Sequence, residues 1–140
     1  DIEETARKVD AMIRFVDPGV AIDPLADAAP SGLPAFRQVF SGDRKLTSLL
    51  SGETAVLLDL ARRYSRLELP TFDEMAEAAV GEFLNLVNGL FTVNCSDIGI
   101  ELDMSPPEPV GVKDPLRRRK PAVIAPLRLP EGILRVSLVD

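Results

Sequence analysis

The chain has 140 residues, of which 46% are hydrophobic and 27% are charged, and its formal net charge at pH 7 is −6. This length and apolar content predict a single globular domain, residues 1–140, and exclude general disorder. The acidic charge disfavours nucleic acid as the main partner, and no uninterrupted apolar run is long enough to span a membrane. The charged segment DIEETARKVD lacks an apolar signal core, which predicts a cytoplasmic location.

Two residue counts limit the chemistry: histidine is absent and Cys95 is the single cysteine. Ser-His and Cys-His hydrolases are therefore excluded, and the shortage of nitrogen and sulfur ligands disfavours a zinc site. We expect no metal ligand set in this chain. Because Cys95 lies in an apolar-flanked stretch, its expected role is that of a buried structural thiol.

The N-terminal part is expected to hold one helix and then a loop. Apolar residues recur at helical spacing over residues 1–16, which predicts a helix, and Asp17-Pro18-Gly19 ends it. Prolines at positions 18, 24, 30 and 34, together with several small residues, predict that residues 17–43 are mostly loop. The core of the domain is then expected within residues 44–140.

Residues 44–50 alternate weakly and predict a strand, and an amphipathic helix is expected over residues 52–67. Pro70 separates this helix from the next one. Thr71 is a favourable N-cap, and Glu74 stands three residues later, as in a capping box. A second helix is therefore predicted to begin at Thr71.

Strands are expected to dominate the C-terminal part. Residues 96–104 place Ile98, Ile100, Leu102 and Met104 on one face, which predicts a half-buried strand. Residues 121–129 and 132–139 predict a β-hairpin that turns at Pro130-Glu131. The element order predicts an α+β fold, in which helices pack on one face of a largely antiparallel β-sheet.

A run of four basic residues, Arg117 to Lys120, lies between Pro115 and Pro121. It contains no aromatic residue on which a base could stack. A solvated loop is the expected structure, and docking of an acidic partner is the alternative.

The helix over residues 71–91 has one apolar face and one unusual polar face. The apolar stripe comprises Phe72, Met75, Ala76, Ala79, Phe83, Leu86 and Leu90, extended by Val80, Leu84, Val87 and Phe91. On the other side, Ala78, Glu82, Asn85 and Gly89 form a ridge, with Gly81 beside it. Such small residues around a carboxylate and a carboxamide predict a flat shelf for close approach by a partner. For Gly89, a helix C-terminus at Asn88-Gly89 is an equally good interpretation.

A glutamate and an asparagine one turn apart support a limited chemistry. A carboxamide holds a water molecule by donating and accepting at once, and a carboxylate pairs with a lysine or accepts a proton. Glu82 and Asn85 therefore suit the hydrolysis of an activated compound, in which placing the water accounts for most of the acceleration. The partner would have to supply the metal and the positive charge.

These residues resemble the helix motif of the CheC/CheX/FliY family of chemotaxis phosphatases. Glu82 and Asn85 match its E-x-x-N pair, Gly89 its following glycine, and Pro107 or Pro109 its downstream proline in SPPEPV. A single copy of the motif is present, which is similar to CheX rather than CheC. Ala78 departs from the pattern, since the family often has Asp or Ser there.

The resemblance implies a CheX-like α+β fold, a homodimer, and hydrolysis of the aspartyl-phosphate on a CheY-like receiver domain. It implies that Asn85 orients the attacking water and that Glu82 pairs with the receiver's lysine. Ala78, Gly81 and Gly89 would contact the partner. No cofactor of its own is implied, since Mg²⁺ is expected on the receiver. The alternative is a binding or dimerisation module without turnover, which Ala78 favours.

Overall fold

The computed structural model describes residues 21–22, 32–119, 121 and 123–139. The helix expected over residues 1–16 lies outside the described residues. The described helices are α2 (Thr54–Ser65), α3 (Glu74–Ser96) and the short 3₁₀ helix η1 (Pro115–Arg118). The strands are β1 (Ala21–Ile22), β2 (Ala35–Gly42), β3 (Leu46–Ser51), β4 (Leu102–Met104), β5 (Glu108–Pro109), β6 (Val123–Leu129) and β7 (Gly132–Val139).

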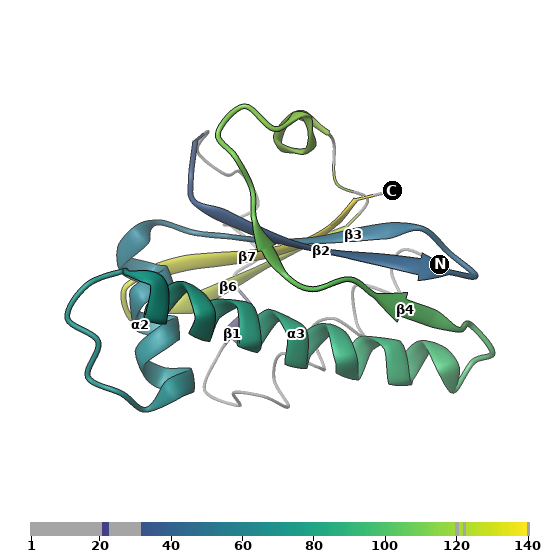
Figure 1. The fold of residues 1–140 in the computed structure, drawn as a ribbon, viewed down its shortest axis with the longest axis horizontal. Coiled ribbons are helices and arrows are strands. Elements are labelled where there is room, and N and C mark those ends of the chain that lie inside the picture. The colour runs from purple at the N-terminus through teal and green to yellow at the C-terminus, as the bar shows by residue number, and fades with distance from the viewer. Residues whose placement is uncertain (1–20, 23–31, 120, 122, 140) are drawn as a thin grey trace.

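Within the described residues, seven strands form one antiparallel sheet in the order β1-β6-β7-β3-β2-β4, and β5 also pairs with β2. Both α2 and α3 lie on the same side of the sheet (Figure 1). The predicted α+β fold is therefore confirmed, as are the strand expected over residues 44–50 and the helix expected over residues 52–67. The hairpin of β6 and β7 is confirmed as well, with Leu129 opposite Gly132.

The core lies between the sheet and the two helices. Inward-facing Phe36 and Phe40 of β2 meet the apolar face of α3, where the rings of Phe40 and Phe91 have centroids 5.3 Å apart. Cys95 is buried in the same core, as predicted. No described helix is long and apolar enough to cross a membrane.

The expected loop over residues 17–43 is wrong in its last third, where residues 35–42 form β2. This strand pairs with β3 on one side and with β4 and β5 on the other, so it lies inside the sheet. Pro34 precedes the strand rather than interrupting it. The nearby prolines outweighed a short stretch in which inward-facing and outward-facing residues alternate. In it, Gln38 faces inward between Phe36 and Phe40.

Helix α3 differs from its prediction at both ends. Its N-cap is Asp73, whose Oδ1 accepts a hydrogen bond from the Ala76 N–H at 3.1 Å, so the capping box at Thr71 is wrong. The helix continues through Gly89 to Ser96, which also excludes a C-terminus at Asn88-Gly89. Burial of Phe91 and Cys95 against the core offsets the poor helix propensity of glycine and asparagine.

The strand that follows this helix is shorter than predicted. The strand expected over residues 96–104 is reduced to β4, and Ile98 lies exposed in the preceding turn.

In the apolar stripe of α3, Met75 and Leu86 are 60% and 42% exposed, whereas the other stripe residues within the helix are buried or half-buried. The sheet covers only part of the helix circumference, so residues at the edge of the stripe reach solvent.

The basic run is docked on the protein through its first residue, Arg117, and its last residue, Lys120, lies outside the described residues. It begins in η1, and the Arg117 guanidinium donates hydrogen bonds to the main-chain carbonyls of Leu33, Val110 and Gly111. Arg118 and Arg119 are exposed.

An ion-pair cluster fastens the same segment to β2. The Arg37 guanidinium contacts the carboxylates of Glu108 and Asp114 at 2.7 and 2.8 Å. The hydrogen bond that Arg37 donates to the Glu108 carboxylate is the main cause that raises the pKa of Arg37 above its usual value. The two contacts tie β5, which pairs with β2 in the sheet, and the start of η1 to Arg37 of β2. They therefore also position the chain that connects β4 to η1.

Candidate functional site

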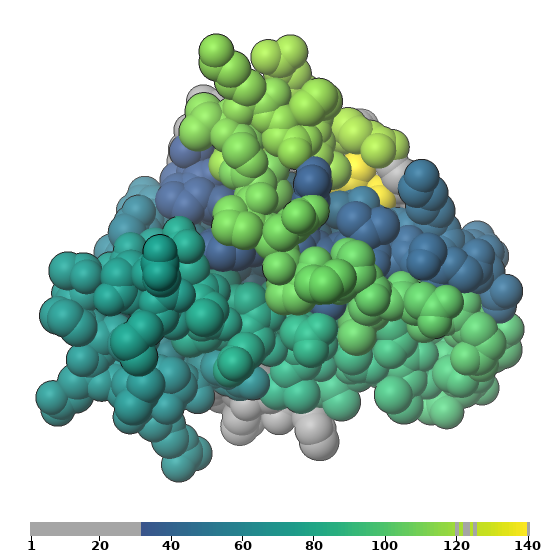
Figure 2. Space-filling model, in the orientation of Figure 1, coloured from purple at the N-terminus to yellow at the C-terminus, as the bar shows by residue number. Residues whose placement is uncertain are grey.

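An open groove with a volume of about 880 Å³ lies between α3 and the segment 104–109, which joins β4 to β5. Figure 2 shows the yellow-green surface of this segment against the teal and green surface of α3. Helix α3 supplies Ala78, Gly81, Glu82 and Asn85 to the groove, and Tyr64 of α2 also lines it. We call this the site groove. It brings together four of the five residues predicted for the site.

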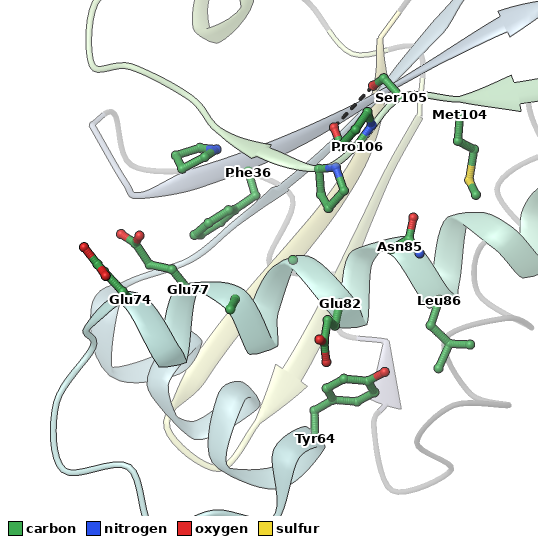
Figure 3. A pocket seen from close by; sticks show the side chains of 14 residues that line it. Phe36, Tyr64, Glu74, Glu77, Glu82, Asn85, Leu86, Met104, Ser105 and Pro106 are labelled. Carbon is green, nitrogen blue, oxygen red and sulfur yellow. Dashed lines mark hydrogen bonds between the residues drawn. The ribbon is translucent and has the colours of Figure 1, made fainter.

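The two predicted catalytic residues are both exposed, as the shelf interpretation requires. Figure 3 shows the Asn85 carboxamide directed toward Ser105 and Met104, whereas the Glu82 carboxylate lies on the side of Tyr64. Tyr64 itself is fixed by an edge contact with Phe83, with ring centroids 5.8 Å apart. A partner lying in the groove can therefore reach a carboxylate and a carboxamide at once.

The Asn85 side chain is held from beneath by a residue that the sequence analysis missed. Gln38 of β2 is fully buried, and its Nε2 donates to Asn85 Oδ1 at 2.7 Å and to the Ser105 carbonyl at 2.8 Å. Buried Asn88 donates from Nδ2 to Gln38 Oε1 at 2.8 Å. The signal in the sequence is a polar residue within the alternating stretch FRQVF, but the prolines that precede it predict a loop there.

The two glycines have a different neighbour from the one expected. A Cβ on Gly81 would meet the Pro107 ring at 3.5 Å, and a Cβ on Gly89 would meet Met104 Cε at 3.8 Å. The chain's own segment therefore lies beside both residues, and their contact with a partner stays a prediction. Gly81 still lines the site groove, whereas Gly89 does not. Pro107 and Pro109 both line it, and Pro107 is the proline that packs on α3.

Replacing Gly89 by alanine is expected to stabilise the protein by about 0.5–1 kcal/mol. Gly89 lies in the interior of α3, where alanine is the better helix former, and among the described residues the new Cβ would meet the flexible end of Met104. Urea unfolding monitored by circular dichroism measures the change. A loss of stability would show that the space beside Gly89 is needed. Gly81→Ala is the matched comparison, because its Cβ contacts a proline ring and should gain less.

The site groove is acidic. Among the described residues that line it are three glutamates, Glu74, Glu77 and Glu82, and no lysine or arginine. No group of three or more cysteine, aspartate or glutamate side chains in the described residues is arranged to hold a metal ion. The groove therefore presents negative charge and hydrogen-bonding groups to whatever enters it, and it suits a partner that carries a cation.

Comparison with known proteins relates this geometry to a family. The family model "Chemotaxis phosphatase CheX" matches residues 37–127, which span β2 to β6 and include the whole site groove apart from Phe36. The chain belongs to the CheX family. No curated protein sequence matches the chain. The resemblance seen in the E-x-x-N motif is thus confirmed at the level of the family.

Solved structures of CheX-type proteins share the fold. CheX from Vibrio vulnificus is 15% identical with a TM-score of 0.72, and 97% of this chain and 98% of that chain are covered. The CheX of a CheX-CheY-BeF3-Mg²⁺ complex from Borrelia burgdorferi is 16% identical with a TM-score of 0.71 over 99% and 97% of the two chains. FliY from Thermotoga maritima is 17% identical with a TM-score of 0.58 over 97% and 84%. At these identities the likeness establishes the fold alone.

Proposed function

We propose that this CheX-family chain hydrolyses the aspartyl-phosphate of a CheY-like receiver domain. The observation that carries the proposal is the exposure of Glu82 and Asn85 on one helix, in an acidic groove whose described lining has no lysine or arginine. A receiver would bring the phosphoryl group, Mg²⁺ and a lysine. The complex of the Borrelia burgdorferi protein with CheY, BeF3 and Mg²⁺ supports this choice of partner.

In the proposed reaction, a water molecule attacks the phosphorus atom of the receiver's phosphoaspartate. An O–P bond to water forms, the bond from phosphorus to the aspartate oxygen breaks, and inorganic phosphate and a free carboxylate result. Asn85 orients the water and Glu82 pairs with the receiver's lysine, while Mg²⁺ on the receiver neutralises the phosphoryl oxygens. Because acyl phosphates are already activated, positioning is the main contribution required of this chain.

Ala78 favours a second candidate function, a module that binds receivers without turnover. It lines the groove at the position where the family often has Asp or Ser, and its methyl group offers no hydrogen bond to the receiver. In this alternative the same groove docks on a receiver, and the phosphate lifetime does not change. The two candidates differ only in turnover, so one assay separates them.

The experiment follows loss of phosphate from a purified, phosphorylated CheY-like receiver with Mg²⁺ present. Catalytic amounts of the chain should shorten the half-life at least about tenfold, a modest gain for a positioned water. Val112→Ala is a control variant, because Val112 is exposed and does not line the groove. Binding to several receivers without acceleration would favour the binding module and contradict the phosphatase.

We also propose that the chain is a homodimer, as the family resemblance implies, and that it is cytoplasmic, as the charged segment DIEETARKVD predicts. Light scattering on the purified protein measures the mass in solution. The mass of a single chain at micromolar concentration would contradict the dimer. Cell fractionation tests the location, and recovery of the protein outside the cytoplasmic fraction would contradict it.

A further inference from the structure

Gln38 connects three elements that form the site groove. Its side chain extends from β2 toward α3, is fully buried, and makes hydrogen bonds with Asn85, Asn88 and Ser105. Ser105 is itself fixed to β2. Its Oγ accepts a hydrogen bond from the Val39 N–H at 3.0 Å, and its main-chain N–H donates to the Val39 carbonyl. A buried carboxamide with these partners is held in one orientation.

The hydrogen-bonding pattern determines which end of the Asn85 carboxamide faces the groove. The Ser105 main-chain carbonyl can only accept, so the amide nitrogen of Gln38 must face it. The second N–H of that nitrogen then points at Asn85, and only an oxygen can accept it. Asn88 donates to the remaining Gln38 oxygen and completes the set. The Asn85 NH₂ group is thereby left for the groove.

We propose that Gln38 is a positioning residue, which fixes the Asn85 carboxamide so that it offers an N–H donor, rather than its oxygen, to the groove. The catalytic consequence rests on the proposed function. An N–H donor holds a water molecule through one lone pair of the water oxygen. The other lone pair stays available for attack on phosphorus. The orientation itself does not depend on any reaction.

Gln38→Met tests the catalytic consequence, because methionine has a similar length and lacks both hydrogen-bonding groups. The Asn85 carboxamide is then free to rotate, so kcat for receiver dephosphorylation should fall about tenfold, as expected for a misplaced water. Because Gln38 is buried and does not line the groove, KM for the receiver should change less than about threefold. A variant with the kcat of the wild type would overturn the positioning role.

Ser48→Ala provides the matched control. Ser48 lies opposite Gln38 on the neighbouring strand β3, is equally buried, and its Oγ has no hydrogen-bond partner among the described residues. A general effect of altering buried polar residues in this sheet would appear in both variants. We expect kcat to remain at the wild-type value in Ser48→Ala, and an equal loss in both variants would contradict a specific role for Gln38.

Hydrogen exchange of side-chain amides, measured by NMR on the wild-type protein, tests the orientation without any receiver. The Gln38 NH₂ protons should exchange slowly, whereas the Asn85 NH₂ protons should exchange as fast as those of a free amide. Protected Asn85 protons would overturn the inference, even if the chain is an active phosphatase. The expected pattern in a chain without phosphatase activity would uphold the orientation and reject the proposed function. Because the exchange measurement uses the wild-type protein, it also decides the orientation of Asn85 if the Gln38→Met variant does not fold.

Discussion

Replacing Asn85 by alanine is expected to lower the rate of receiver dephosphorylation about a hundredfold. The carboxamide is the only group we assign to the attacking water, and loss of a positioned reactant costs about this factor. Since Asn85 is exposed, water can enter its place and satisfy the Gln38 N–H. The stability should therefore fall by no more than about 1 kcal/mol. Single-turnover decay of the phosphorylated receiver and thermal unfolding measure the two quantities.

Asn85→Asp is the matched control for this prediction. The carboxylate keeps the shape of the side chain and still accepts the hydrogen bond from Gln38 Nε2, but it has no N–H to offer to the groove. Activity should fall as in Asn85→Ala, whereas the buried hydrogen bonds of Gln38 remain. Acceleration that persists in Asn85→Ala would mean that another residue positions the water.

Replacing Phe40 by alanine is expected to destabilise the protein by about 3–5 kcal/mol. The ring is fully buried between the sheet and α3 and packs on Phe91, so its removal leaves a cavity in addition to the lost burial. Such a change is a large part of the 5–15 kcal/mol that typically stabilises a domain. Urea unfolding at 25 °C gives the difference in free energy of unfolding.

Val112→Ala serves as the comparison for Phe40→Ala. Val112 is 79% exposed, so its truncation should change the free energy of unfolding by less than about 0.5 kcal/mol. A similarly small change for Phe40→Ala would indicate that residue 40 lies in a surface loop. That result would support the assignment made from the sequence and contradict the strand β2.

The local sequence pattern determined those elements in which a regular apolar period continues over a long segment. The apolar stripe of α3, the helix α2 and the hairpin of β6 and β7 could all be predicted, because repeats of 3.6 or 2.0 residues reveal which face is buried. The same periodicity placed Glu82 and Asn85 on the exposed side of their helix. The family followed from those two residues with the glycine and prolines that accompany them.

Only the tertiary structure decided what depends on contacts between distant segments. Gln38 lies 47 residues before Asn85, so no local pattern could show that its amide holds the site residue. The glycines of α3 lie beside the chain's own segment 104–109. The helix extends past Gly89 because Phe91 and Cys95 are buried in the core. Burying a phenylalanine side chain in a packed core stabilises the protein by more than the roughly 1 kcal/mol that a glycine costs in a helix. Packing therefore set the C-terminal end of α3, whereas hydrogen bonds of Gln38 with distant partners set the orientation of Asn85.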